Sequence, residues 1–192
     1  MWRDVLADGR VWKLLPAIDR ELADETRAAG CAACGGPLHS ARYPRKPRRG
    51  PPAELVSEYA RRESLCCARE DCRRRVTPPS VRFLGRRWYL GSVVVLVSAI
   101  TEGVTPKRAA AMRKLVGVSI RTLNRWRAWW LRTLPRTEFW RGARGVFGSP
   151  VDEHALPASL LKRFGDDEME GIIACLRFLA PITTRGGYLM AE

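Results

Sequence analysis

Long apolar runs are missing from this chain of 192 residues. The longest is Val93 to Val97, whereas a transmembrane helix needs roughly 20 apolar residues in a row. The N-terminus reads MWRDVLADGR, so charges stand where a signal peptide has its apolar region. Hydrophobic residues still make up 46% of the sequence, which is enough for a folded core. We therefore expect a soluble, globular protein that stays in the cytoplasm and has no membrane partner.

Histidine is scarce as well, because the chain has only 2, at positions 39 and 154. His39 is followed by Ser40 and Ala41, so the His-x-Glu signature of zinc deaminases is absent. A His-hydrophobic-His pair with a downstream tyrosine is absent too, as is an Arg/His/Tyr set of the recombinase type. We interpret His39 as a polar loop residue; the alternative is a metal ligand that replaces a cysteine. His154 has no partner that the sequence identifies.

Positive charge, in contrast, is in excess, and it is concentrated in the middle of the chain. The formal net charge is +14, and residues 1–39, 40–135 and 136–192 contribute −1, +16 and −1 to it. A GC-rich genome explains why arginine outnumbers lysine, but it does not explain this clustering. A concentrated basic region favours binding to a polyanion, because each phosphate that is neutralised releases condensed counterions. We therefore expect double-stranded DNA as the partner and association with the nucleoid.

Hydrophobic periodicity predicts amphipathic helices near both ends of the chain. The first spans residues 11–29 and stops at Gly30, with a kink expected at Pro16. Its apolar positions are Val11, Leu14, Leu15, Ile18 and Leu22. The last spans Asp167 to Leu179, with Cys175 as an ordinary thiol of the core. Residues 139–150, FWRGARGVFGSP, read as a loop.

Two cysteine clusters predict a metal site, because cysteines in a reducing compartment are more often ligands or buried thiols than disulfides. Cys31 and Cys34 form a Cys-x2-Cys knuckle, which two glycines follow. The second pair is Cys67 and Cys72, about thirty residues further on, with a spacing of four that is at the wide end for zinc modules. Four thiolates form a closed structural zinc site, which folds a segment that has little core of its own.

Cys66 and Cys67 compete for the third ligand position. Alternate side chains of a strand point in opposite directions, so Cys67 faces the core if Leu65 does, and Cys66 faces away. We therefore predict Cys67 as the ligand. The segment between the two clusters contains Arg42–Pro52, RYPRKPRRGPP, for which two interpretations stay open: a solvated linker or an arm along a phosphate backbone.

Residues 88–135 predict a helix-turn-helix unit of three helices. A mostly apolar segment, Trp88 to Gly103, is read as a buried helix, with a strand as the alternative. A short helix then starts at Thr105-Pro106, and Ser119 caps a third helix that runs to Pro135. Leu123, Trp126, Trp130 and Leu134 form the apolar face of this third helix.

The opposite face of the third helix is predicted to read DNA. In a helix-turn-helix, the N-terminal part of the second motif helix enters the major groove, where arginine reaches guanine and asparagine reaches adenine. The candidates for base contacts are Arg121, Thr122, Asn124 and Arg125. Lys107, Arg108, Arg113 and Lys114 are expected near phosphates. Trp129 lies off the apolar face, where it packs on the C-terminal segment or supports a homodimer.

The motif order resembles that of bacterial insertion-sequence transposases over residues 30–135. Cys-x2-Cys, a basic spacer, a second cysteine pair and CRRRVTPPSVRFLGRR are similar to the N-terminal zinc ribbon of those proteins. The resemblance implies that Cys31, Cys34, Cys67 and Cys72 bind zinc and that residues 88–135 hold transposon ends. Near this ribbon, Arg73, Arg74, Arg75, Arg82, Arg86 and Arg87 are expected to present charge to DNA.

One departure from that family limits the expected function. Such transposases continue into a ribonuclease-H-like domain with three metal-binding carboxylates, and the 57 residues after Pro135 are too few to hold one. We therefore expect no enzyme but an accessory or stand-alone DNA-binding protein of a mobile element, with a transposase or recombinase encoded nearby as a partner. A transcriptional regulator and a zinc enzyme acting on nucleic acid are the alternatives.

These expectations divide the chain into four parts and give a mainly α fold class with a small zinc-ribbon β module. The parts are an amphipathic helix (1–29), a zinc-ribbon-like module with a basic loop (30–87), a helix-turn-helix unit (88–135) and a C-terminal helical tail without an assigned role (136–192).

Overall fold

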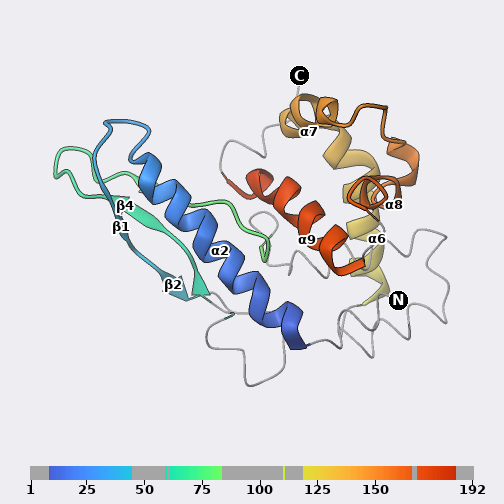
Figure 1. Cartoon of the computed structure of the whole chain (residues 1–192), viewed down its shortest axis with the longest axis horizontal. Helices are drawn as coiled ribbons and strands as arrows, with labels where there is room; N and C mark the ends of the chain where they lie inside the picture. The colour runs from blue at the N-terminus through green and yellow to red at the C-terminus, as the bar shows by residue number, and fades with distance from the viewer. Residues whose placement is uncertain are drawn as a thin grey trace.

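The computed structural model describes residues 9–44, 59, 61–83, 110, 119–165 and 168–184. Along the long axis of the molecule, a small β module lies at one end and the helices α6 to α9 lie at the other (Figure 1). Helix α2, Gly9–Ala29, runs from the helical end alongside the β module. Several predicted features lie outside the described residues. They are the first two helices of the helix-turn-helix unit, except for residue 110, and the basic loop from position 45 onward. The basic residues among them are Arg86, Arg87, Lys107, Arg108, Arg113 and Lys114.

The N-terminal amphipathic helix is confirmed, with one correction to its apolar face. Val11, Leu15 and Ile18 are buried, because their spacing of three and four places them on one side of the helix. Leu14, which we predicted on that face, lies at its edge and is 40% exposed. Pro16 lies inside the helix, and the chain leaves the helix at Gly30, where a φ of 74° favours glycine.

The β module consists of short antiparallel strands, as a small ribbon requires. β1 (Leu38–Ser40), β4 (Leu65–Cys67) and β5 (Arg75–Val76) form a three-stranded sheet in the order β1-β4-β5. β2 (Tyr43–Pro44) pairs separately with β3 (Arg61–Arg62). The core of the module is small, because its buried apolar residues are Leu38, Leu65 and two of the cysteines. A core of this size leaves most of the stability of the module to be supplied by other contacts.

The helical end is built from short helices that follow one another along the chain. They are α6 (Ile120–Ala128), a π-helical turn η2 (Trp129–Thr133), η3 (Leu134–Arg136), α7 (Glu138–Ala143), η4 (Arg144–Val146), η5 (Glu153–Ala155), α8 (Ala158–Leu161), α9 (Glu168–Leu179) and η6 (Ala180–Thr183). The prediction of a loop over 139–150 was wrong at its beginning. Thr137 accepts a hydrogen bond from the amide of Trp140, and this N-cap starts α7.

The predicted apolar face of the third helix is confirmed. Leu123, Trp126, Trp130 and Leu134 are all buried in a cluster that also includes residues of α2, α7 and α9. Ser119 caps the helix, as predicted, by accepting from the amide of Thr122. Trp129 is half-buried and packs edge-on against Trp130, so it belongs to the periphery of this core. On α9, Ile172, Leu176 and Leu179 are buried, and so is the thiol of Cys175, which was predicted to belong to the core.

A buried ion pair joins the β module to α2, and it corrects one sequence-based interpretation. Arg82 was expected to present charge to DNA, but it is only 2% exposed and donates from Nε to Asp19 at 2.8 Å. Its other nitrogens donate to the carbonyls of Tyr59 and Arg61, and its guanidinium lies over the rings of Tyr59 and Phe83. Asp19 also accepts from Ser80 and from the amide of Val81. Arg82 is therefore part of the core.

The expected fold class is confirmed at the coarse level, since helices dominate and the strands form small antiparallel sheets. A helix-turn-helix remains a prediction, because only its third helix is described. Among the described residues, no helix combines the length and the apolar character needed to cross a membrane.

Candidate metal centre

Four cysteine sulfurs converge at the end of the β module. The Sγ atoms of Cys31, Cys34, Cys67 and Cys72 all lie within 4.8 Å of one another. Cys31 and Cys72 are 3.8 Å apart, and Cys34 and Cys67 are 3.5 Å apart. These are the four cysteines that the sequence predicted as ligands. They come from two segments that are more than thirty residues apart, so the sheet brings the two knuckles together.

The first knuckle is a tight turn between α2 and β1. The amides of Cys34 and Gly35 both donate to the carbonyl of Cys31, and Cys31 in turn donates to the carbonyl of Gly36. Gly35 has a φ of 67°, a left-handed conformation that glycine adopts without strain. The chain therefore turns back on itself within six residues, and both sulfurs point to the same side.

The second knuckle lies between β4 and β5, and its wide spacing is absorbed by a single turn. Cys72 and Arg73 both donate from their amides to the carbonyl of Arg69. Arg73 then has a φ of 44°, which reverses the chain into β5. The amide of Ala68 donates to the carbonyl of Pro37 and so fixes this knuckle to the strand that follows the first one.

Cys67, and not Cys66, belongs to the four-sulfur cluster, as the alternation along the strand predicted. Leu65 and Cys67 are fully buried on one face of β4, whereas Cys66 lies on the other face, opposite His39 on β1 and Arg75 on β5. Its Sγ lies 3.5 Å from the carbonyl oxygen of Arg73 and is not part of the cluster. His39 is exposed on β1, so it is neither a loop residue nor a member of the cluster.

Backbone amides point at each of the four sulfurs. In each case the donor is the amide two residues after the cysteine: Ala33 for Cys31, Gly36 for Cys34, Arg69 for Cys67 and Arg74 for Cys72. The Ala33 amide contributes most to lowering the pKa of Cys31 from 9.0 to about 7. Amide–sulfur hydrogen bonds favour the thiolate form, which is the form that binds metal.

The other three thiols have raised pKa values. At Cys67 the largest cause is burial, which penalises a thiolate. At Cys34 the Gly36 amide lowers the pKa, but burial and the neighbouring thiol of Cys67 outweigh it. At Cys72 the Arg74 amide is outweighed by the thiol of Cys34 and by burial. Four thiolates cannot be held together here without a cation, because each raises the pKa of the next.

The geometry of the four sulfurs fits one tetrahedral metal ion. With metal–sulfur bonds of about 2.3 Å, a tetrahedral site places its sulfurs roughly 3.8 Å apart, close to the separations found here. An all-sulfur tetrahedral set is typical of zinc and of iron. The cluster can therefore hold a metal ion, with the amides of both knuckles as its outer hydrogen-bond donors.

The structure also shows a contact that the sequence did not reveal. A Cβ atom on Gly36 would lie 3.0 Å from the Cγ and Cδ atoms of Arg69, so the stem of this arginine lies across the first knuckle. A side chain at position 36 would push this stem aside by a few tenths of an ångström, so glycine gives the closest fit between the two knuckles. Gly36 is explained by this packing between knuckles, which no pattern within either knuckle could have indicated.

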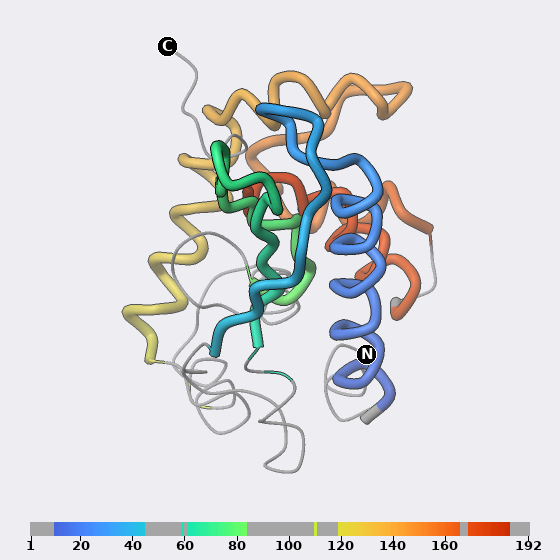
Figure 2. Tube along the Cα trace, turned by 90° about the vertical axis from the view of Figure 1, so that its left-hand side faces the viewer, coloured from blue at the N-terminus to red at the C-terminus, as the bar shows by residue number. Residues whose placement is uncertain are grey.

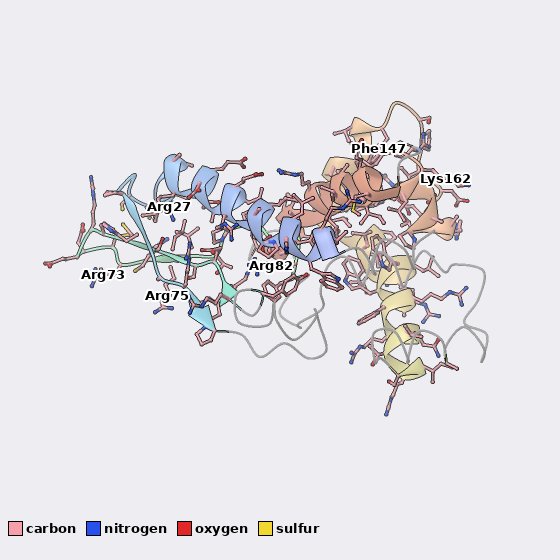
Figure 3. The ribbon with its side chains drawn as sticks, turned by 60° about the horizontal axis from the view of Figure 1, so that its bottom comes forward. Arg27, Arg73, Arg75, Arg82, Phe147 and Lys162 are labelled. Atoms are coloured by element: carbon pink, nitrogen blue, oxygen red, sulfur yellow. The ribbon has the colours of Figure 1, made fainter. Side chains whose placement is uncertain are left out.

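The predicted DNA-contacting residues occupy two separate places. Arg73, Arg74 and Arg75 are exposed on the second knuckle and β5, and Figure 3 shows Arg73 near the tip of the β module and Arg75 further back along it. Arg121, Asn124 and Arg125 are exposed on α6, and Thr122 is half-buried. Figure 1 shows the β module and α6 at opposite ends of the long axis, and in the view along this axis α6 lies behind the strands and to the side away from α2 (Figure 2). The fold therefore separates the two basic regions instead of merging them.

Comparisons with protein-family models, with curated proteins and with solved structures find no match to this chain.

Proposed function

We propose that this protein is a zinc-dependent DNA-binding protein related to insertion-sequence transposases. It acts as an accessory or stand-alone factor of a mobile element, without performing strand transfer itself. The observation that carries the proposal is a set of exposed arginines on α6 and on the two helical turns after it, η2 and η3, with no acidic residue in the same segment. Residues 119–137 contain five arginines and no aspartate or glutamate.

Ion pairs elsewhere in the molecule show how an arginine is neutralised when an acidic side chain lies near it. Several arginines outside α6 form ion pairs: Arg27 with Asp24, Arg42 with Glu63, Arg144 with Glu153 and Arg177 with Glu21. In the described part of the chain, Arg121 and Arg127 make no side-chain hydrogen bond or ion pair. Unpaired guanidiniums on one surface repel one another, and a polyanion removes this repulsion.

The roles of the residues on α6 follow from where they lie on the helix. Arg121, Asn124 and Arg125 belong to the first two turns and are proposed to contact base edges, with Thr122 beside them. Lys107 and Arg108 are proposed to contact phosphates, which fixes the register on the duplex without reading its sequence. These roles rest on a helix-turn-helix arrangement of residues 88–135.

The β module is proposed to bind zinc and to supply a second, sequence-independent contact. Zinc suits four thiolates in a reducing cell, and the metal stabilises a module with little core of its own. Arg73, Arg74 and Arg75 stand exposed beside the centre, with Arg86 and Arg87 further along the chain. Because four sulfurs fill a tetrahedral zinc site, no position is left for a catalytic water, which argues against the zinc-enzyme alternative.

The proposal is tested by substitution on α6. A duplex site is first selected from a random-sequence pool with the full-length protein. Arg121→Ala and Arg125→Ala are expected to weaken binding to this site by about 1–3 kcal/mol each, because each removes a base contact. Lys162→Ala is the control, since it also removes one exposed positive charge but lies beyond α8.

Two results would contradict the proposal. If the protein binds no duplex in a salt-dependent way, DNA binding is wrong. If both arginine variants bind the selected site as the control does, α6 is not the recognition helix. Selection of an operator near a promoter, instead of the ends of a mobile element, would favour the transcriptional-regulator alternative.

A further inference from the structure

Exposed arginines continue along the chain after the end of α6. Arg132 lies in the π-helical turn η2, Arg136 ends η3, and Arg141 lies in α7. All three side chains are exposed, and in the described part of the chain none makes a hydrogen bond or an ion pair. Glu138 is the one acidic residue between Arg121 and Arg144 in the sequence.

The elements α6, η2 and η3 follow one another without a break, and this continuous segment is called the rod below. Its length separates Arg132 and Arg136 from the bases, and Arg141 follows on α7. At 1.5 Å per residue, Arg132 and Arg136 lie roughly 17 and 22 Å along the axis from Arg121. The major groove is only about 8.5 Å deep. If the first turns of α6 reach base edges, the far end of the rod leaves them, because the rod continues straight while the groove winds around the duplex, and it comes level with the phosphates. Figure 3 shows α6 extending away from α8 and α9 with nitrogen-tipped side chains along it.

The helical geometry keeps Arg132 on the same side as the proposed base contacts. Trp126, Trp130 and Leu134 are buried on one face of the rod, and the wider π-helical turn between them does not move the buried face. Arg132 is therefore held on the solvent side, as Arg121 and Arg125 are. The rod presents positive charge from its first turn to its last.

We propose that Arg132, Arg136 and Arg141 form a second contact surface that binds the sugar–phosphate backbone of the same duplex, beside the bases that α6 reads. This inference rests on the proposed function. It gives the C-terminal part of the chain a role in DNA binding, because Arg136 and Arg141 lie beyond the helix-turn-helix unit. The surface contributes affinity and salt dependence, and it contributes no sequence preference.

The charge of this surface favours phosphate as its ligand. Three unpaired guanidiniums with one nearby carboxylate match a line of single negative charges, and arginine binds phosphate through two parallel hydrogen bonds. An acidic protein segment could bind the same three arginines. In that case, removing the arginines would leave the salt dependence of DNA binding unchanged.

The test measures how affinity for a mixed-sequence duplex depends on salt. Each phosphate contact contributes about 0.9 to the slope of log affinity against log salt concentration. Arg132→Gln/Arg136→Gln is therefore expected to reduce this slope by about 2, and Arg141→Gln alone by about 1. Preference for the selected site over the mixed-sequence duplex should stay the same in both variants.

Two control variants separate contact from total charge and from folding. Lys13→Gln/Lys162→Gln removes the same charge from exposed residues of α2 and of the segment after α8, and its slope should equal that of the wild type. Arg132→Lys/Arg136→Lys keeps the charge and should keep most of the slope. Circular dichroism checks that each variant retains the wild-type helix content.

The outcomes distinguish this inference from the function on which it rests. If the wild type binds DNA and Arg121→Ala weakens it, but Arg132→Gln/Arg136→Gln has the slope of the lysine control, this inference is wrong and the proposed function stands. The inference is also wrong if the glutamine variants lose site preference instead of slope. If the wild type shows no salt-dependent binding to duplex DNA, the proposed function is wrong, and this inference with it.

Discussion

At the scale of single residues, two adjacent thiols have different environments because they belong to a strand. Cys67 is fully buried among the other three sulfurs, whereas Cys66 lies on the outer face in a row with His39 and Arg75. The antiparallel partners on both sides prevent the strand from rotating. A shift of one residue would exchange the two thiols, but it would also expose Leu65, which is fully buried.

Separate serine substitutions test this assignment. Cys67→Ser is expected to abolish tight metal binding, because a hydroxyl does not replace a buried thiolate ligand. Cys66→Ser should keep one metal ion per chain, with the cobalt-substituted protein showing four-thiolate charge-transfer absorption. Metal content and the cobalt spectrum are measured on both variants. Retention of four thiolate ligands in Cys67→Ser, with a loss in Cys66→Ser, would reverse the assignment.

At the scale of elements, each knuckle combines a chain reversal with amide donors aimed at sulfur. The reversal depends on left-handed backbone at Gly35 and Arg73, and the donors are the amides two residues beyond each cysteine. These donors ease ionisation most at Cys31, while burial and neighbouring thiols hold the remaining three protonated. Metal binding must therefore displace protons from the knuckles.

The proton balance predicts the pH dependence of metal affinity. At pH 7, binding should release about 3.5 protons, because Cys31 with a pKa of about 7 is half-ionised and the other three cysteines are protonated. Apparent affinity should rise about 10³-fold per pH unit above pH 7, as long as the other three thiols stay protonated, and about 10⁴-fold per unit below pH 6. Calorimetry in buffers of different ionisation enthalpy measures the protons, and competition with a chelator measures the affinity. Release of two protons or fewer at pH 7 would mean that some of the four thiols are not ligands.

At the scale of the whole molecule, two hydrophobic clusters are joined by a polar connection. The cluster of the β module includes Leu38 and Leu65, and the larger cluster lies between α2 and the helical end. Arg82 and Asp19 connect them, since Arg82 follows β5 in the chain and Asp19 lies on α2. This ion pair is one of the contacts that hold the β module against α2, together with the hydrogen bond from Arg27 of α2 to Ser40 of β1.

Removing one partner of this pair should be costly. Arg82→Ala leaves the buried carboxylate of Asp19 without its countercharge, so the free energy of unfolding should fall by about 3–5 kcal/mol. Arg136→Ala, which removes an exposed arginine without a partner in the described structure, should change it by less than about 0.5 kcal/mol. Urea unfolding of the metal-loaded protein measures both. Equal stability of the two variants would mean that the pair contributes little to holding the parts together.

Short-range patterns in the sequence were enough to predict the four clustered cysteines and several helix boundaries. Alternation along a strand identified Cys67, capping by Ser119 marked the start of α6, and spacings of three and four identified its buried face. Each of these depends on residues within one or two turns of one another, and local backbone geometry dictates such relations. The end of α2 at Gly30 belongs to the same class, because a left-handed residue stops a helix wherever it occurs.

The sequence by itself therefore determined the four cysteines of the candidate metal centre, the basic character of the middle of the chain and the face that α6 buries. The tertiary structure alone decided which arginines remain at the surface. Arg82 looks like its neighbours in the sequence, yet it is buried because Asp19, 63 positions away, lies beside it in the fold. Composition also could not predict that Arg69 lies over Gly36 or that the two basic regions lie apart along the molecule. Burial and pairing depend on contacts between distant segments, and local periodicity carries no information about which segments meet.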